Sequence, residues 1–505
     1  MTMKNIKYIM VLLVGLFSLA SCDDYLSEVP DSRIELDNID KVAELLANAY
    51  PECSYLFLET LTDNVEAAPT NRTTQTSEEL FCWKTVSSIS QDSPSFYWTY
   101  AYRGIAHANQ ALVSLEILDG DKTRINAIKG EALLIRAYCH FMMVNIFSKH
   151  YNEATAATDL GIPYATHPES TLVAKYKRET VAKNYGQIEK DMLDGLALID
   201  NRFYKGSGKY HFTREAALAF ASRFYLYKKD YANCLSFSNQ LLGAGYNPTF
   251  IKDYQKVLAG QGPKGRAQVF SSTSEASNLL MMRKSVMYQL KFYVGYRLTN
   301  KIANTLYKYD ARSRNMWAVN TDQLVVYQAK FEDLLERTSS SGSGMPYTVQ
   351  TVFRGDEVLF NKLEAMWELA ALESDEVKQA EMDKDIYALL NPFLVERYNG
   401  KSGSDYVTGT IDSYKTMYYK GLTPKDRDVF KRIMLDERRR EFCEEGLRWF
   451  DIKRLGIEIT HKNLAGKIDV LKANDSRQVL QIPASAISNG LEPNIIGDDS
   501  PVTQN

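Results

Sequence analysis

The stretch RINAIKGEALLIRAYCHFMMVNIF, residues 124–147, decides the fold class. Its apolar residues follow two helical stripes. One stripe advances by four and three residues in turn from Ile128 to Ile146, and a second one runs from Leu133 to Val144 on another face. A surface helix carries a single apolar stripe, so two stripes predict a helix that is buried on both sides. Such a helix is typical of stacked helical layers.

Three further stretches with helical periodicity extend this scaffold. Thr180 is expected to cap a helix over residues 181–199, where apolar residues recur every three or four positions. Thr213 is expected to begin a pair of helices whose polar turn falls at residues 228–230. A further helix is expected from Asp356 onward, because its apolar residues keep the same step. The chain is therefore predicted to be mainly α-helical.

The stretch TREAALAFASRFYLYKKDYANCLSFSNQLL, residues 213–242, resembles a tetratricopeptide repeat unit. Tyr225 and Tyr231 stand where such repeats place aromatic residues, and Ala219 and Ala221 are small enough for two helices to approach closely. Units of this kind stack so that each one buries the apolar face of its neighbour. A plain helical bundle is the alternative.

Glycine-rich and polar stretches interrupt the helices and predict loops. The region from about 245 to 350 has little clean periodicity and is rich in Tyr, Asn and Ser. Loops on a rigid scaffold often carry binding residues, so we expect an irregular, loop-rich ligand face there. The predicted loops are residues 205–212, 243–250, 260–266, 339–346 and 399–409.

A search for catalytic motifs finds none. The chain has no HExxH, no CxxC pair, no phosphate-binding glycine loop and no GxSxG turn. Its six histidines are scattered without metal-ligand spacing. We therefore expect a binding protein that is not an enzyme, with no cofactor and no metal-ligating residues that the sequence identifies. A hydrolase with two carboxylates across a cleft is the alternative.

Composition and charge exclude several classes. The 505 residues carry a net charge of −3 and an ordinary apolar fraction, which predicts a folded globular chain with no electrostatic affinity for nucleic acid. The cysteines are few and scattered, so no disulfide framework is expected. A single bridge between Cys53 and Cys82 is compatible with an exported protein.

The first residues predict export and lipidation. Lys4 and Lys7 precede an apolar run over residues 9–20, which is shorter than the roughly 20 residues that a membrane span needs. A basic start, an apolar run and small residues form a secretory signal, here residues 1–21. The sequence LASC then resembles a bacterial lipobox that ends at Cys22, the expected lipid attachment point. An ordinary signal peptide is the alternative.

The densest motif is DERRREFCEEGLRWFDIKR, residues 436–454, with six acidic and six basic side chains. It has two interpretations: a charged active site or anion site, and an ion-pair network that fixes a helix to the scaffold. The close alternation of sign favours the network. Glu444 with Arg448, and Arg448 with Asp451, have the spacing of local ion pairs.

Around this motif, MLDERRREFCEEGLRWFDIKRLG resembles the C-terminal signature of the SusD/RagB family, the nutrient-uptake lipoproteins of Bacteroidetes. Five other parts of the chain resemble the same family. They are CDDYLSEVP at 22–30, WTYAYRGIAHANQAL at 98–112, the helix at 128–148 with GIPY at 161–164, YKYDARSRNMW at 307–317, and LQIPASAISNGLEPN at 480–494.

The resemblance implies a SusD-like fold with tetratricopeptide-type helical pairs as its scaffold. It implies one SusD-like domain over residues 22–505, with a helical-repeat half at about 22–245 and a RagB/SusD half at about 246–505. Family members are lipid-anchored at the cell surface, on the outer membrane. They capture oligosaccharides, or in some cases peptides, and deliver them to a SusC-type TonB-dependent transporter.

The resemblance also gives an expected ligand site. Sugars present apolar C–H faces and hydroxyl groups, which suit aromatic rings beside fixed polar side chains. In the family the early loops and the mid-chain insert build the ligand face, here residues 60–98 and 285–320. Core packing is the alternative for each aromatic residue, and it is favoured for Trp98. The candidate residues are Asp63, Asn64, Arg72, Trp83, Tyr97, Tyr288, Tyr293, Tyr296 and Trp317.

Overall fold

The computed structural model describes most of the chain beyond its first residues. For residues 317–319 and 426–429 it describes the backbone only. The described residues are 36–68, 73–169, 176–206, 208–260, 262–287, 295–307, 317–319, 326–337, 344–398 and 426–497.

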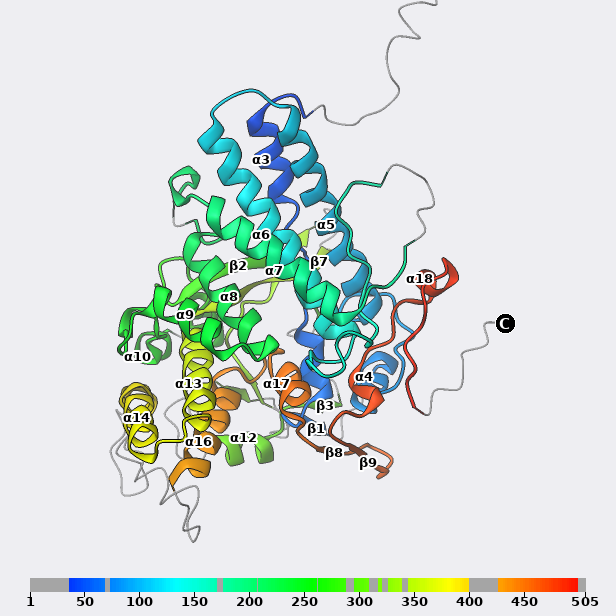
Figure 1. Cartoon of the computed structure of the whole chain (residues 1–505). Helices are drawn as coiled ribbons and strands as arrows, with labels where there is room; N and C mark the ends of the chain where they lie inside the picture. The colour runs from blue at the N-terminus through cyan, green and yellow to red at the C-terminus, as the bar shows by residue number, and fades with distance from the viewer. Residues whose placement is uncertain are drawn as a thin grey trace, which may run out of the picture.

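Three long helices form the upper part of the molecule (Figure 1). They are α5 (Pro94–Ile117), α6 (Lys122–Phe147) and α7 (Val181–Leu198), and α6 packs against both of the others. Every residue of α6 from 130 to 147 is buried, which confirms the predicted two-sided burial. The shorter helix α3 (Ile39–Ala47) packs against α5.

Glycines let α6 and α7 approach closely. A Cβ atom added to Gly130 would lie 2.9 Å from the carbonyl oxygen of Gly195, and one added to Gly195 would lie 2.8 Å from that of Gly130. Neither position therefore has room for a side chain. At the start of α7 the hydroxyl of Thr180 accepts the N–H of Lys183, as predicted for its N-cap.

The predicted helical pair is confirmed as α8 (Arg214–Lys228) and α9 (Tyr231–Leu242). Thr213 caps α8, and Asp230 caps α9 by accepting the N–H of the third residue after it. Lys229 ends the first helix in the left-handed conformation, with φ +62°. The polar turn therefore has the two elements that separate a helical pair, a left-handed C-cap and a new N-cap.

The lower part of the molecule is also helical (Figure 1). The helix predicted from Asp356 is α13 (Gly355–Ala371), which packs against α9, α14 (Glu376–Tyr398) and α16 (Asp426–Glu441). The chain then turns into α17 (Arg448–Leu455).

Part of the region expected to be irregular forms an antiparallel sheet. Its central strand β7 (Gly344–Arg354) pairs with β2 (Asn278–Ser285) and β6 (Leu334–Arg337). The expectation of loops was wrong for these strands, because β2 is buried at most positions and its sequence lacks the alternation that indicates a strand. The other antiparallel pairs are β1 (Glu66–Ala67) with β3 (Tyr296–Arg297), β4 (Trp317–Val319) with β5 (Val326–Gln328), and β8 (Ile459–Lys462) with β9 (Ile468–Leu471).

Short helical elements complete the described chain. The loop predicted at 260–266 was wrong from Gly262 onward, where α11 (Gly262–Phe270) begins, because a proline is compatible with the first turn of a helix. The other short elements are η1 (Leu56–Leu61), α4 (Gln75–Phe81), η2 (Asn201–Phe203), η3 (Pro248–Phe250), α10 (Tyr254–Leu258), α12 (Asn300–Leu306), η5 (Ser476–Gln478) and α18 (Ala484–Ser488).

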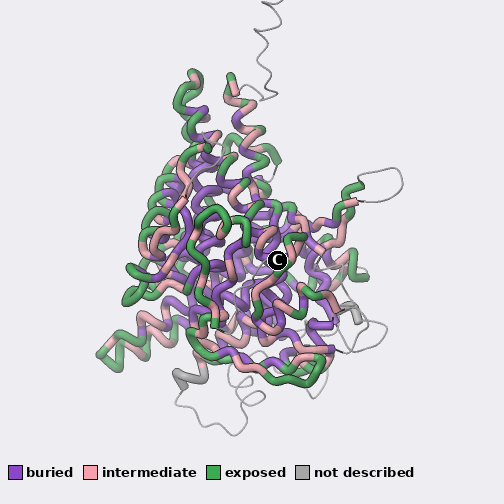
Figure 2. The backbone as a smooth tube through the Cα atoms, turned by 90° about the vertical axis from the view of Figure 1, so that its right-hand side faces the viewer, coloured by how far each residue is buried: buried purple, intermediate pink, exposed green. Residues whose placement is uncertain are grey.

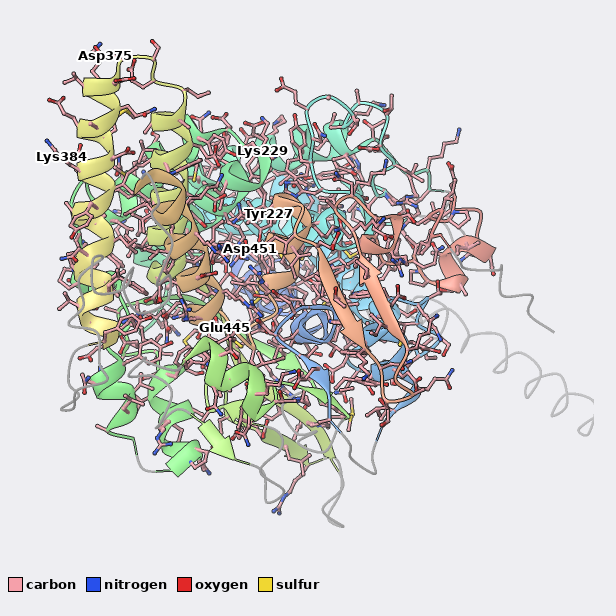
Figure 3. The ribbon with its side chains drawn as sticks, turned by 90° about the horizontal axis from the view of Figure 1, so that it is seen from below. Tyr227, Lys229, Asp375, Lys384, Glu445 and Asp451 are labelled. Atoms are coloured by element: carbon pink, nitrogen blue, oxygen red, sulfur yellow. The ribbon has the colours of Figure 1, made fainter. Side chains whose placement is uncertain are left out.

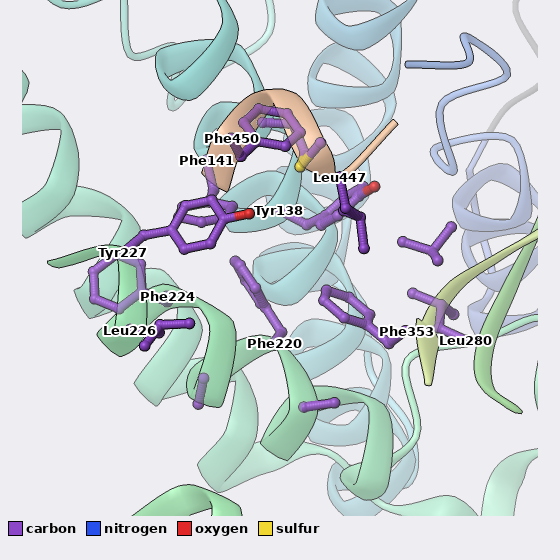
Figure 4. Packing of buried hydrophobic residues seen from close by; sticks show 14 of the residues in the cluster. Tyr138, Phe141, Phe220, Phe224, Leu226, Tyr227, Leu280, Phe353, Leu447 and Phe450 are labelled. Atoms are coloured by element: carbon purple, nitrogen blue, oxygen red, sulfur yellow. The ribbon is translucent and has the colours of Figure 1, made fainter. Parts of the chain in front are cut away.

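One large apolar core joins residues from both ends of the described chain. Figure 4 shows its centre, where Tyr138 and Phe141 of α6 pack with Phe220 of α8, Phe353 of β7 and Phe450 of α17. Figure 2 shows buried backbone through the middle of the molecule and exposed backbone at its periphery.

The charged C-terminal block forms a buried ion-pair network, as the structural interpretation predicted. Arg438 pairs with Asp451 at 3.0 Å, and both are almost fully buried. The predicted local pairs were wrong: Arg448 pairs with Asp63, and Glu444 with Arg297. Glu444 and Gly446 have positive φ angles, so residues 444 and 448 do not lie on one helical turn.

The described cysteines are all free thiols, Cys53 and Cys82 included. The possible bridge between these two is therefore not formed. Over the described residues, no helix combines the length and the apolar character that a membrane span requires.

Candidate functional site

A cleft of about 340 Å³ lies between α5, the segment that follows α6 and the C-terminal segment around α18. We call it the aromatic cleft. Its walls combine aromatic rings with amide, imidazole, carboxylate and hydroxyl groups. The residues that line it are Trp98, Tyr102, Ile105, Ala106, Asn109, Pro163, Ala165, His167, Glu169, Tyr176, Ser485, Ala486, Asn489 and Leu491.

One face of α5 forms the first wall. Trp98, Tyr102, Ile105 and Asn109 follow one another at steps of four, three and four residues, so they share one face of the helix. The indole of Trp98 is 9% exposed and packs against Tyr102, at 4.9 Å between ring centroids, and against Phe147, at 5.0 Å. The wall is therefore a rigid aromatic surface.

The second wall is the segment after α6, and two side chains of α5 hold it. The hydroxyl of Tyr102 donates to the carbonyl of Pro163 at 2.8 Å. The amide of Asn109 donates to the carbonyls of Ala165 and His167 at 3.1 and 3.3 Å. The backbone of this loop is thus fixed by hydrogen bonds to a helix.

A buried arginine supports the same loop from behind. Arg136 of α6 forms a two-bond ion pair with Asp191 of α7, at 2.7 and 2.8 Å. It also donates to the side chain of Asn109 and to the carbonyl of Thr166. Tyr164 completes the group by donating to Asp191 at 2.7 Å. A planar guanidinium suits this role because its donors have a fixed geometry.

His140 is the other support of this loop. Burial lowers the pKa of His140 to about 3, so its ring is neutral. Its Nε2 accepts the N–H of Ala165 at 3.1 Å, while Nδ1 lies 2.9 Å from the carbonyl of Arg136 and donates to it. The ring also stacks on Tyr164, with centroids 3.8 Å apart. The histidine therefore has a structural role.

The C-terminal segment forms the third wall and is tied to the end of α6. Asn494 donates to the carbonyls of Phe147 and Leu480 at 2.9 and 2.8 Å. Arg178 donates to the carbonyls of Gly161, Phe147 and Glu492, and so joins the second wall to the third.

The rim of the aromatic cleft carries the polar groups that a ligand would meet. The Tyr176 hydroxyl donates to Glu169 at 2.9 Å, and burial together with this carboxylate raises the pKa of Tyr176 to about 12. His167, Ser485 and Asn489 are exposed. Aromatic faces next to such groups can bind the apolar face and the hydroxyls of a sugar.

Asp63 and Asn64, two of the candidate site residues, lie away from this cleft and hold the C-terminal block. Asp63 accepts two hydrogen bonds from Arg448, at 2.9 and 3.0 Å, and pairs with Arg439. These guanidinium groups hold the pKa of Asp63 well below its usual range against the opposing effect of burial. Asn64 is fully buried between Glu59 and Arg439.

Trp83 and Tyr296 belong to one stack of buried rings. Phe81 stacks on Tyr296 at 4.2 Å and on His461 at 4.0 Å, and His461 stacks on Trp83 at 4.3 Å. The indole N–H of Trp83 donates to the carbonyl of Leu61. Trp83 is 3% and Tyr296 1% exposed, so the structure places both in the interior.

Tyr97 is the remaining candidate whose side chain the structure describes. Tyr97 is 2% exposed and packs edge-on to Phe57. Trp317 lies in β4, where only the backbone is described. Four further predicted residues lie outside the described residues: Arg72, Tyr288, Tyr293 and the lipidation site Cys22.

The sequence contained a signal for one wall of the aromatic cleft. Trp98, Tyr102 and Asn109 share a helical stripe, and a polar residue in such a stripe marks a special position. Trp98 was assigned to the core, and it is both packed and at the cleft wall. Tyr176 and Asn489 carried no such signal, because they meet α5 only through the tertiary fold.

The side chains of the aromatic cleft can make hydrogen bonds and aromatic contacts with a ligand. Among the described residues, no three His, Cys, Asp or Glu side chains come together as a metal site. The aromatic cleft contains one carboxylate, Glu169, hydrogen-bonded to Tyr176.

Comparison with known proteins gives the family. The sequence model described as "SusD family" matches residues 169–482, more than half of the chain. A second one, described as "Starch-binding associating with outer membrane", matches residues 24–226. A comparison with curated proteins finds no match.

Solved structures share the fold over nearly the whole chain. A SusD superfamily protein from Bacteroides thetaiotaomicron has a TM-score of 0.67 and 20% identity, and the match covers 91% of this chain and 100% of that one. A laminarin-binding SusD-like protein has a TM-score of 0.63 and 14% identity, with 91% and 99% covered. Surface glycan-binding protein A from Bacteroides uniformis has a TM-score of 0.63 and 16% identity, with 90% and 99% covered. The resemblance noted in the sequence is confirmed, and the chain belongs to the SusD family.

Proposed function

We propose that this protein is a lipid-anchored glycan-binding protein of the cell surface that captures an oligosaccharide in the aromatic cleft. The observation that carries the proposal is the make-up of this cleft, in which a rigid aromatic wall faces exposed polar groups. Two solved proteins with the same fold are described as laminarin-binding and as surface glycan-binding, which supports a glycan as the ligand class.

Membership of the SusD family supports the remaining parts of the proposal. Delivery to a SusC-type TonB-dependent transporter would make the bound oligosaccharide available for uptake. Lipidation at Cys22 would hold the protein on the outer membrane, next to that transporter. We propose binding without turnover, as expected from a sequence without the HExxH, CxxC, phosphate-loop and GxSxG motifs. Capture of a peptide is the alternative ligand.

The test is calorimetric titration of the chain from residue 23 with neutral oligosaccharides such as maltoheptaose and laminarihexaose, and with peptides. We expect an oligosaccharide to bind and to be recovered uncleaved. Tyr176→Ala should weaken that binding roughly fivefold, because a sugar–aromatic contact is worth about 1 kcal/mol. Asn489→Ala should weaken it as well.

The matched control is Tyr210→Ala. Tyr210 is 47% exposed and lines a separate hollow, beside Tyr100 on the opposite face of α5. This variant should bind as the wild type does. If only peptides bind, the ligand is a peptide and not a glycan. Release of shorter sugars would contradict the proposal that the protein is not an enzyme. Co-purification of a SusC-type transporter with the full-length protein, lost in Cys22→Ala, would support the transport step.

A further inference from the structure

A second hollow, of about 490 Å³, lies on a different part of the surface from the aromatic cleft. Four segments enclose it: residues 149–159 after α6, Lys229 between α8 and α9, residues 453–456 at the end of α17, and residues 474–479. We call it the basic cavity, because lysine, arginine and histidine side chains line it.

Several charged groups in its wall are already neutralised by partners. Each one pairs with an opposite charge at hydrogen-bond distance, so none of them leaves a net charge in the cavity. These pairs are Lys149 with Asp159 at 2.7 Å, Asp475 with Arg477 at 2.8 Å, and Arg454 with Glu364 and Asp451.

Two lysines remain without such a partner. Within the part of the chain that the structure describes, no carboxylate lies within 4 Å of Lys229 or Lys453. Lys453 is 5% exposed, and its ammonium group donates to the carbonyls of Asn145 and Ser148 at 2.6 and 2.8 Å. Burial lowers the pKa of Lys453 to about 7, and its charged form has three protons, so one is left for a further acceptor. Figure 3 labels Tyr227 and Lys229 at the C-terminal end of α8, and Asp451 on α17.

One ring nitrogen of a histidine in the same wall has no hydrogen-bond partner among the described residues. Nε2 of His150 is buried and has no hydrogen bond within the described residues. Burial lowers the pKa of His150, and the charges of Lys453, Arg454 and Lys229 lower it further. Of these three cations, Arg454 is paired with Glu364 and Asp451, whereas Lys229 and Lys453 have no such ion pair among the described residues. A buried ammonium without a counter-charge is costly, and an anion beside it would lower that cost.

We propose that the basic cavity binds an acidic substituent of a glycan, a carboxylate or a sulfate group, through Lys229 and Lys453 with His150 beside them. This inference rests on the proposed glycan-binding function and extends it to acidic sugars. Charge-assisted hydrogen bonds from two lysines to one oxyanion give the contact both strength and selectivity over neutral sugars. A neutral part of the same glycan would form no charge-assisted hydrogen bond in the basic cavity.

The test compares tetragalacturonate with its methyl ester, which has the same sugar rings without the charges, by calorimetry on the mature protein at pH 7. We expect tetragalacturonate to bind and the ester to bind at least about tenfold more weakly. Lys229→Gln should reduce the affinity for tetragalacturonate about tenfold and leave that for the ester unchanged. Lys229 is exposed, so this variant is expected to fold. Lys453→Gln, checked for its melting temperature, should act in the same direction.

The control is Lys205→Gln, which removes the same charge from an exposed position that does not line the cavity. It should bind tetragalacturonate as the wild type does. Equal binding of the acid and the ester, or no effect of Lys229→Gln, would overturn the proposal. Binding of inorganic sulfate alone, without tetragalacturonate or a sulfated disaccharide, would also overturn it, as an adventitious ion only. Loss of neutral-sugar binding in Tyr176→Ala tests the aromatic cleft separately.

Discussion

Glu59 is a carboxylate without any exposed surface at the contact between η1 and the C-terminal block. Its oxygens accept the backbone N–H groups of Glu444 and Gly446 at 2.9 and 3.0 Å, and the side chain of Asn64 at 2.7 Å. Burial nevertheless raises the pKa of Glu59 from its ordinary 4.5 to about 7. The donors lower the pKa, but they compensate only part of the cost of desolvating the charge.

This pKa predicts how Glu59 affects stability. Between pH 4.5 and 7 the folded carboxyl holds a proton that the unfolded one has lost, so its contribution to the free energy of unfolding decreases as pH rises. The total decrease is roughly 3 kcal/mol. Urea unfolding of the wild type and of Glu59→Gln at several pH values will measure it. The wild type should lose stability relative to the variant from pH 5 to 7, whereas a constant difference would contradict the raised pKa.

The roles of the candidate residues Asp63 and Asn64 could not be predicted from their local sequence. An acid and an amide that stand close to aromatic residues in the sequence are typical of a sugar-binding site. The residue types alone therefore favoured a ligand-binding role for Asp63 and Asn64. The ion pair of Asp63 with Arg448 spans 385 positions of the chain. Only the tertiary fold brings these two charges together, so no local spacing could have predicted it.

At the scale of elements, two glycines allow α6 and α7 to approach each other closely. Gly130 and Gly195 face each other, and the carbonyl of each would lie within 2.9 Å of a Cβ on the other. Gly186 lies in the same helix as Gly195, but it is exposed and a Cβ there would meet no atom within 4 Å. The chain thus provides its own control.

We expect Gly195→Ala to lower the free energy of unfolding by about 1–3 kcal/mol, because the added methyl group forces the two helices apart. Gly186→Ala should raise it by about 0.5–1 kcal/mol, since alanine loses less backbone entropy on folding. Denaturant unfolding of both variants measures the difference. Equal changes in the free energy of unfolding at the two positions would show that helix propensity, and not the contact with α6, determines the effect of alanine.

The sequence predicted these helices well and the strands poorly, for physical reasons. Helices with apolar residues every three or four positions and a Thr or Asp cap were confirmed, among them α6, α7 and α8. Strand β7 is partly exposed at alternate residues in its first half and fully buried in its second. Alternation then disappears from the sequence, and with it the signal for a strand.

For the molecule as a whole, the C-terminal block connects segments from the entire chain. Phe450 of α17 packs against Tyr55 and Tyr227, and Lys453 donates to carbonyls at the end of α6. The aromatic cleft is assembled in the same way, since α5 and α18 meet there from opposite ends of the described chain. Its α5 wall could be read from helical spacing, whereas the other walls depend on contacts that only the fold creates.

These long-range contacts predict that the two halves at about residues 22–245 and 246–505 do not fold independently. A fragment of residues 22–245 would lack the C-terminal partners of Tyr55 and Asp63, which would leave apolar surface exposed and Asp63 unpaired. We expect calorimetry to show one cooperative transition for the whole chain and none for the fragment, whose near-ultraviolet circular dichroism should be flat. The control is the whole chain with a protease site after Gly245, cleaved once folded, which should keep its transition. A sharp transition in the isolated fragment would instead establish the first half as a domain.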